Sequence, residues 1–291
     1  INERHENPAY LPGATLSASL RASNDLQSVV RDAPVICSVV PSHVSRQILS
    51  SIAPHVAPGT RLICASKGIE IDTLQLMGEV AAEALPQAVF VALSGPSFAE
   101  EVHGGCPTAI VAASRNAAAA TETQQLFSTK TFRLYSSDDV TGVTLGGSLK
   151  NAIAIAAGIL DGLGLGHNAR AALLTRGLAE IARLGSALGA NAATFSGLAG
   201  MGDMILTCTG ALSRNRQLGM ALAGGSTLEE FHAAHNTVVE GVNTARAASR
   251  LAERHGVELP ITRQVAAVLF EGVAPRVAIQ TLMERTLKAE R

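Results

Sequence analysis

The sequence predicts two parts of different class: an α/β half built on a largely parallel sheet, followed by an all-helical half. In the first half, short continuous apolar runs alternate with segments of helical periodicity, which is typical of strands covered by helices on both faces. After Asp138–Asp139 no convincing strand pattern recurs, and glycine and proline separate a series of helical segments. We therefore expect an α/β domain over residues 1–138 and a helical domain over residues 139–291.

The elements of the first half follow from its apolar runs and its turn residues. A short strand is expected over Leu20–Ser23, and Asn24 or Asp25 is placed to cap a short helix over Leu26–Arg31. Ser97 and Glu100 have the spacing of a capping box, which predicts a short helix after them. The longer strands are expected over Pro34–Val40, Arg61–Ala65, Ala88–Leu93, Thr108–Ala113 and Thr131–Tyr135, and the longer helices over Pro41–Ile52, Thr73–Ala84 and Ala117–Phe127.

The second half is predicted to be helical throughout. Apolar residues recur there at steps of three and four, which places them on one helix face. Glycine and proline interrupt this pattern at Gly162–Gly166, Gly224–Gly225 and Leu259–Pro260. The expected helices are Leu145–Leu160, Ala169–Leu188, Arg214–Ala223, Thr227–Ala234, Gly241–His255, Ile261–Phe270 and Pro275–Arg285.

Composition excludes several classes of protein. The chain is 47% hydrophobic and 16% charged, which favours a packed core over disorder. Its net charge is −1 and it has no tryptophan and only two tyrosines. It therefore offers neither a basic surface nor a stacking platform, and we expect no nucleic-acid partner. The longest apolar run, Ala152–Leu160, is too short for a bilayer, so no membrane span is expected.

The polar N-terminal residues lack the apolar core of a signal peptide. The four cysteines are dispersed and mostly lie in apolar runs, without a CxxC pair, and are interpreted as buried, reduced thiols of a cytoplasmic protein. The eight histidines are dispersed as well, and no HExxH, P-loop or GxSxG motif is present. We therefore expect no metal site and no serine hydrolase.

Lys150 is the first candidate for chemistry. It lies with Asn151 in an otherwise small and apolar helical stretch, Gly142–Gly162. Burial there would lower the pKa of the amine, so that Lys150 could donate and accept a proton near neutral pH. The alternative is a lysine with a packed stem and a hydrated ammonium group.

Further polar residues follow two of the expected parallel strands. Lys67 comes directly after one strand, and Gly95–Pro96–Ser97 comes after the next. The carboxyl ends of parallel strands share one edge, where ligands usually bind. The backbone N–H groups after Ser97 could hold an anion or a carbonyl oxygen, although an ordinary surface lysine and a plain capped turn would have the same sequence.

Three segments of the helical half carry the remaining candidates. The glycine-rich stretch Gly197–Asp203 lacks a preceding strand, so it is no dinucleotide fingerprint, but it places one carboxylate beside close-packing residues. Ser213 is a natural N-cap, and Arg214 and Asn215 in the first turn would suit a phosphate dianion. Glu240 begins another helix. The simpler interpretation of Ser213–Asn215 is a basic, solvated helix start. The simpler interpretation of Glu240 is an acid that is electrostatically favoured at a helix N-terminus.

Together these segments resemble the NAD(P)-dependent glycerol-3-phosphate dehydrogenases of the bacterial biosynthetic kind. The resemblance extends over essentially the whole chain. In the first half it is carried by VPSH at Val40–His43, ASKGIE at Ala65–Glu70, LSGPSFAEEV at Leu93–Val102 and PTAIV at Pro107–Val111. In the second half it is carried by GGSLKNAIAIAAGILDGLGLG, NARAALLTRGLAE, GLAGMGDMILTCT, SRNRQLG and VVEGV.

The resemblance implies a Rossmann-like dinucleotide-binding domain, a helical substrate domain and reversible reduction of dihydroxyacetone phosphate to sn-glycerol 3-phosphate, for phospholipid synthesis, in a cytoplasmic homodimer. Lys150 matches the proton donor and acceptor and Lys67 the second active-site lysine. Asp203 and Asn151 would orient the two amines. The positions matching substrate contacts are Lys67, Gly95, Ser97, Lys150, Asp203, Ser213, Arg214 and Asn215. Those matching contacts to NAD or NADP are Lys67, Ala99, Arg214, Val238 and Glu240.

One departure from the family stands out. The family begins with a strand, a GxGxxG turn, a helix and a second strand, and the sequence contains no such unit. We therefore expect the Rossmann-like sheet to be N-terminally truncated, with strand edges unpaired or separated by a gap, and nucleotide binding to be weak. The choice between NAD and NADP, which the family makes near that second strand, stays open.

Two alternatives to this enzyme remain. One is a related β-hydroxyacid or 6-phosphogluconate-type dehydrogenase, against which the Arg214–Asn215 pair and the GPSFAEE segment argue. The other is a catalytically inactive relative that dimerises or senses a ligand. The missing N-terminal unit favours this second alternative, whereas the complete set of matching active-site residues opposes it.

Overall fold

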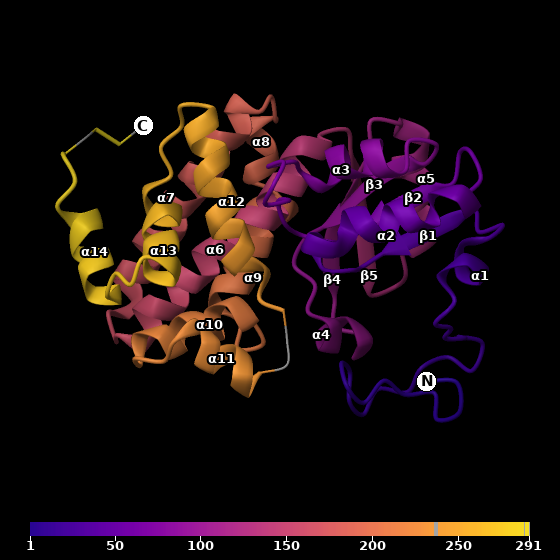
Figure 1. The fold of residues 1–291 in the computed structure, drawn as a ribbon, viewed down its shortest axis with the longest axis horizontal. Coiled ribbons are helices and arrows are strands. Elements are labelled where there is room, and N and C mark those ends of the chain that lie inside the picture. The colour runs from indigo at the N-terminus through magenta and orange to yellow at the C-terminus, as the bar shows by residue number, and fades with distance from the viewer. Residues whose placement is uncertain (236–237, 288, 291) are drawn as a thin grey trace.

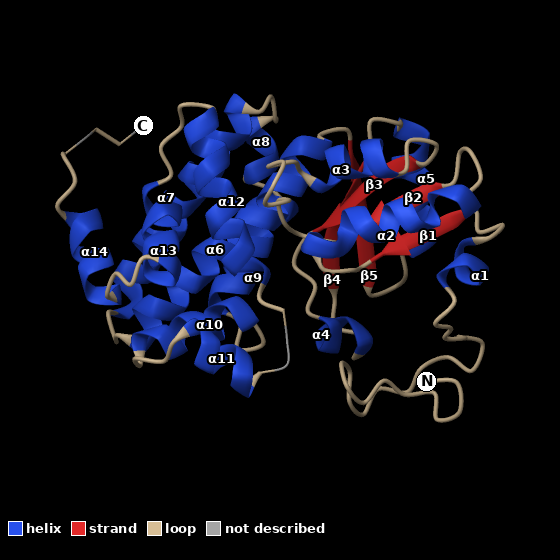
Figure 2. Ribbon diagram, in the orientation of Figure 1, coloured by secondary structure: helices blue, strands red, loops and turns tan. Residues whose placement is uncertain are grey.

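A computed structural model of the chain describes residues 1–235, 238–287 and 289–290. An α/β half and a helical half lie side by side, with all strands in the first (Figure 1, Figure 2). The strands are β1 (Val35–Ser38), β2 (Arg61–Cys64), β3 (Val89–Ser94), β4 (Thr108–Ala113) and β5 (Phe132–Ser137). The expected succession of a strand-containing half and a helical half is confirmed.

The five strands form one sheet in the order β1-β2-β3-β4-β5. Neighbours run parallel except β3 and β4, which are antiparallel. The predicted, largely parallel sheet is confirmed, with β4 as the difference. The segment between β3 and β4 contains only the short helix α4 (Ala99–His103), which is too short to cross a sheet face as a parallel connection requires.

The part of the chain that the structure describes shows no gap in the sheet, contrary to expectation, because its five strands pair continuously. Within the described residues β1 pairs with β2 alone, so its other side is a sheet edge. No strand forms over Leu20–Ser23, where that short strand was expected.

Helices cover both faces of this sheet. Leu62 of β2 packs with helices α2 (Ser45–Ile52) and α3 (Met77–Ala84) on one face. The next residue, Ile63, packs on the other face with Ala119 of α5 (Ala117–Phe127). Successive side chains of a strand point to opposite faces, so a continuous apolar run serves two cores. The short helix α1 (Leu26–Val30) begins at the predicted cap, Asp25, and the 3-10 turns η1 (Ser42–Val44) and η2 (Ala53–His55) flank α2.

Two predicted helix starts in this half are wrong. Helix α3 begins at Met77 instead of Thr73, because Leu74 has a φ of 64° and Glu79 caps the helix from its own first turn. The predicted capping box of Ser97 and Glu100 does not form. Helix α4 begins at Ala99, and the Ser97 hydroxyl donates to the Gly95 carbonyl, 3.1 Å away.

The second half consists of helices within the described residues. Its elements are α6 (Val140–Gly162), α7 (Gly166–Ala187), α8 (Ala192–Phe195), η3 (Leu198–Gly202), α9 (Asp203–Thr209), α10 (Arg214–Ala223), α11 (Leu228–Ala234), α12 (Glu240–Arg254), α13 (Pro260–Phe270) and α14 (Pro275–Met283). The predicted helices are confirmed with small shifts at their ends. Helices α8 and α9 and the π-helical turn η3 are not predicted, because they are four, seven and five residues long and too short to show a clear apolar period.

Helix α6 is the centre of the helical half. It packs against α7, α9, α10 and α12. Gly158 and Gly219 let α6 and α10 touch backbone to backbone, since a Cβ at Gly158 would lie 2.0 Å from the Arg216 carbonyl oxygen. By length and hydropathy α6 could cross a bilayer, but 94% of its most apolar 18-residue window is buried in the protein. Such burial is typical of a core helix.

All four cysteines are free. Cys64 and Cys208 are buried, as predicted, whereas Cys37 and Cys106 are exposed, so the prediction of buried thiols is wrong for these two.

Candidate active site

One buried carboxylate joins the two candidate lysines. The Lys67 ammonium donates to Asp203 Oδ2 at 2.7 Å, and the Lys150 ammonium donates to Asp203 Oδ1. Lys150 also donates to the Thr207 hydroxyl at 2.7 Å, which in turn donates to the Asp203 carbonyl at 2.6 Å. Lys150 and Asp203 are 6% and 1% exposed, which makes this a desolvated cluster with one negative and two positive charges.

The surroundings lower the pKa values of both Lys150 and Asp203, for different reasons. Burial, and then the charge of Lys67, lower the pKa of Lys150 from 10.5 to about 8. Burial alone would raise the pKa of Asp203, but the two ammonium groups outweigh it and hold that pKa below its ordinary value. Asp203 therefore remains charged at neutral pH, while Lys150 is poised to exchange a proton.

Small residues on α6 bring the cluster together. Gly146 lies against η3, where a Cβ would come within 2.7 Å of the Ala199 carbonyl oxygen. This close approach brings Asp203, at the start of α9, to Lys150, which lies one turn after Gly146 on α6. Gly147 lies against the end of β3, where a Cβ would come within 2.4 Å of the Ser94 hydroxyl. Close backbone approach thus places the sheet edge beside the helix that carries the amine.

Gly95 completes the sheet side of the site. Its φ of 145° is a conformation that favours glycine, and a Cβ would lie 2.8 Å from Ile110 Cα. In this conformation its carbonyl oxygen accepts from Lys67 Nζ at 3.4 Å and from the Ser97 hydroxyl. Gly95 and Ser97 therefore lie beside the lysine cluster. Ala99 is exposed at the first position of α4.

Ser213, Arg214 and Asn215 have three different environments at the start of α10. Ser213 is buried and caps the helix by accepting from Arg216 N at 3.3 Å. Arg214 is exposed, and no described carboxylate forms an ion pair with it. Asn215 is buried: its amide donates to Asn151 Oδ1 at 3.0 Å and accepts from Gly241 N at 2.9 Å. The arginine alone thus presents an uncommitted charge to solvent.

A second arginine fixes this helix start. Arg216 Nε donates to Asp161 Oδ2 at 2.6 Å, and Arg170 forms an ion pair with the other oxygen of Asp161. These bonds tie α10 and α7 to the end of α6. They hold Arg214 and Asn215 in place relative to Lys150, because Lys150 and Asp161 are both on α6.

The predicted cofactor positions on the helical side lie at the start of α12. Val238 is 38% exposed, directly before that helix. Glu240 Oε1 accepts from Ser42 N at 2.9 Å, and its Oε2 accepts from the Ser42 hydroxyl at 2.5 Å. Glu240 therefore joins the two halves at the carboxyl edge of the sheet, close to Gly68, whose added Cβ would lie 3.1 Å from it.

Thr207, Ser42 and Arg216 also contribute to the site, although none of them is among the predicted site residues. Thr207 had a usable signal, because it follows Asp203 by one helical turn. Ser42 lies 198 residues from Glu240 in sequence, so only the fold reveals their contact. Asn151, expected to orient the amines, instead supports Asn215.

Comparisons with known proteins agree with this arrangement. Residues 1–120 match the family model for the NAD-dependent glycerol-3-phosphate dehydrogenase N-terminus, and residues 139–280 match the model for its C-terminus. The chain is 54% identical over 98% of its length to glycerol-3-phosphate dehydrogenase (NAD(P)+) of Geobacter metallireducens, covering 86% of that protein. A crystal structure of glycerol-3-phosphate dehydrogenase from Coxiella burnetii is 40% identical with a TM-score of 0.94, over 98% of this chain and 87% of that one.

Proposed function

Because the chain belongs to the NAD-dependent glycerol-3-phosphate dehydrogenase family, we propose that it interconverts dihydroxyacetone phosphate and sn-glycerol 3-phosphate with NAD(P)H or NAD(P)+. The observation that carries this proposal is the pair of lysines on one buried aspartate. An uncommitted arginine begins α10, which packs against the helix that carries Lys150. An amine poised near neutral pH suits proton transfer to a carbonyl oxygen, and the arginine suits a phosphate.

Lys150 is the general acid of the proposed reduction. As hydride reaches C2 of the ketone, negative charge develops on the carbonyl oxygen and requires a proton. Lys150 as ammonium donates it, and neutral Lys150 removes it in the oxidative direction. Asp203 and Thr207 accept hydrogen bonds from two of the three N–H groups of the ammonium. The third N–H group is left for the substrate oxygen.

Lys67 and Asp203 set the charge around that proton. Lys67 places a second positive charge near the developing oxyanion and lowers the pKa of Lys150. Asp203 keeps the two ammonium groups together in a buried site, where like charges would otherwise repel each other. Gly95 contributes a carbonyl oxygen that holds Lys67 from the sheet side.

The carboxyl edge of the sheet fits a nicotinamide cofactor. Val39, which follows β1, is 70% exposed, and Val238, which precedes α12, is 38% exposed, so both apolar side chains face solvent. Such side chains suit a flat aromatic ring. Lys67, Ala99, Arg214, Val238 and Glu240 are the residues that would hold the cofactor, which supplies the hydride when bound.

The wider setting of the enzyme follows from the same proposal. We assign residues 1–138 to a dinucleotide-binding domain and residues 139–291 to a helical substrate domain. The reaction would supply sn-glycerol 3-phosphate for phospholipid synthesis in the cytoplasm, and the enzyme would act as a homodimer.

A substrate panel tests the proposal directly. Dihydroxyacetone phosphate, a β-hydroxyacid and 6-phosphogluconate are each offered with NADH or NADPH, or with the oxidised cofactor where oxidation is assayed. Turnover of dihydroxyacetone phosphate alone is the expected result. Preference for either other substrate would assign the chain to a related dehydrogenase, and inactivity of the full chain toward all three would favour an inactive relative.

Arg214→Ala is expected to raise the KM for dihydroxyacetone phosphate by about one to two decades. A charge-assisted contact to phosphate contributes roughly 1.5–3 kcal/mol, which corresponds to that change in affinity. Steady-state kinetics measure it, and Arg214→Lys is the matched control, which should recover only part of the loss because lysine lacks the forked geometry. An unchanged KM would remove Arg214 from the substrate site.

The two directions of the reaction should depend on pH in opposite ways. The pKa of Lys150 is lowered to about 8, so the amine is protonated below that pH and neutral above it. Reduction needs the ammonium and should slow as pH rises through 8, whereas oxidation needs the neutral amine and should accelerate over the same range. Rates of both directions across this range check the assignment.

Lys67→Met supplies the control for this pH dependence. Removing the Lys67 charge removes one cause of the lowered pKa, so both inflections should move to higher pH. Profiles that keep their inflection in this variant would show that Lys67 does not act on the titrating group.

A further inference from the structure

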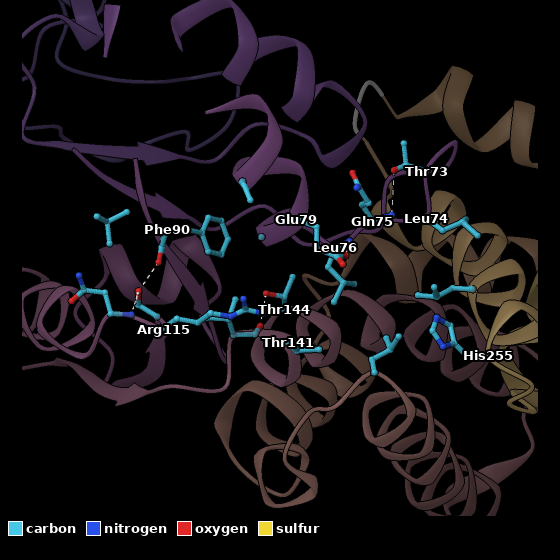
Figure 3. Close-up of a pocket in the computed structure, with 18 of the residues that line it drawn as sticks. Thr73, Leu74, Gln75, Leu76, Glu79, Phe90, Arg115, Thr141, Thr144 and His255 are labelled. Carbon is cyan, nitrogen blue, oxygen red and sulfur yellow. Dashed lines mark hydrogen bonds between the residues drawn. The ribbon is translucent and has the colours of Figure 1, made fainter. Parts of the chain in front are cut away.

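A cavity of about 650 Å³ opens between the two halves (Figure 3). Its α/β wall includes Gln75, Phe90 and Arg115, and its helical wall includes Thr141 and His255. This volume lies within the range of small-molecule sites, about 300–1,000 Å³.

The cavity adjoins the proposed active site but does not include its lysines. Phe90 and Thr144 line the cavity and also border a small hollow beside Lys67 and Ser94, whereas Gly95 follows the end of β3 and does not line the cavity. On α6, Thr144 lines the cavity and Lys150 lies six residues further on, which corresponds to about 9 Å along a helix.

The lining of the cavity combines apolar surface with positive charge. Leu74, Leu76 and Leu251 are buried side chains that border it. Arg115 projects from the α/β wall toward Thr141 and Thr144 (Figure 3). Arg254 of α12 also lines the cavity. A ligand lying between the walls would therefore contact apolar side chains along its body and a guanidinium at either side.

These arginines are not neutralised by the residues around them. No described carboxylate forms an ion pair with Arg115 or Arg254, and Arg254 donates only to the Thr73 carbonyl, 3.3 Å away, in the described structure. Glu79, the acid in the lining, accepts from Leu76 N at 2.8 Å and so faces its own helix start. The cavity thus has an excess of positive charge over an apolar lining.

We propose that this cavity binds an organic anion with an apolar body, held by Arg115 and Arg254 from opposite walls. The proposed substrate, a small and highly polar phosphate, has no apolar body to fill such a space. The ligand class therefore differs from that of the lysine site, and the inference does not depend on the proposed reaction.

Anilinonaphthalene sulfonate, an aromatic monoanion, is the probe that tests the site in the full chain. Its fluorescence titration gives a dissociation constant. Arg115→Glu should raise that constant by at least about tenfold, since a charge-assisted contact is lost and a repulsive one is introduced. Ala82→Trp should abolish binding, because Ala82 lines the cavity from an exposed position on α3 and the larger ring would occupy it.

Arg276→Glu is the matched control, since Arg276 is exposed on α14 and does not line the cavity. It should leave the dissociation constant unchanged, and thermal unfolding should show all three variants folded. Binding that survives in both cavity variants, or that weakens equally in the Arg276 control, would overturn the proposal.

Discussion

Replacing Lys150 with alanine is expected to lower kcat by about two to four orders of magnitude, which is the usual cost of deleting a general acid. Lys150 is the one amine in α6, and its ammonium is bound by Asp203 and Thr207 within a desolvated cluster. Water has poor access to this position, so solvent cannot easily replace the missing proton donor.

The measurement is single-turnover reduction of dihydroxyacetone phosphate at pH 7. Lys150→Met is the matched variant, since it keeps the length of the side chain and avoids a cavity while removing the amine. Equal losses in the two variants would assign the effect to proton transfer. If the alanine variant retained most of the parent kcat, another group would have to be the acid.

Asp203→Asn is expected to lower the free energy of unfolding by about 3–5 kcal/mol, the typical result of removing one partner from a buried ion pair. Asp203 is 1% exposed and receives hydrogen bonds from both ammonium groups. Without its charge, Lys67 and Lys150 would repel each other in a site that solvates them poorly. Urea unfolding of the variant and the parent protein measures the difference.

A triple variant separates charge from packing in this result. Lys67→Met and Lys150→Met combined with Asp203→Asn remove all three charges and preserve most of the volume. Because an apolar replacement of a buried ion pair is often neutral or stabilising, the triple variant should recover most of the lost stability. A loss below about 1 kcal/mol in the single variant would contradict the picture of a desolvated charge cluster.

Local signals in the sequence were sufficient to predict several elements. Helices α5 and α10 have the predicted bounds because Asn116 and Ser213 cap them with their own side chains. Strands β2 and β4 follow continuous apolar runs that are buried on both faces. In each case the information lies within a few residues of the element.

Other features depend on contacts that no local pattern encodes. The Ser97 hydroxyl does not cap α4 as predicted, because it donates to the Gly95 carbonyl oxygen instead. The backbone conformation of Gly95 turns this oxygen toward both Ser97 and Lys67. Lys67 and Asp203 lie 136 residues apart in sequence, so their ion pair exists only once the two halves have met. A lysine in an apolar helix could be recognised from sequence, but its partners could not.

The burial of α6 has a consequence for where motion can occur. Nearly every residue from Gly142 to Leu160 is buried, and opening this helix would expose the centre of the helical half. Its hydrogen bonds therefore belong to the most persistent cooperative unit of the chain, which opens only with global unfolding. Lys67 and Gly95 instead come from connections at the edge of the sheet. Subglobal opening can thus displace Lys67 while Lys150 keeps its position. The proton donor therefore stays fixed while the rest of the site assembles around it.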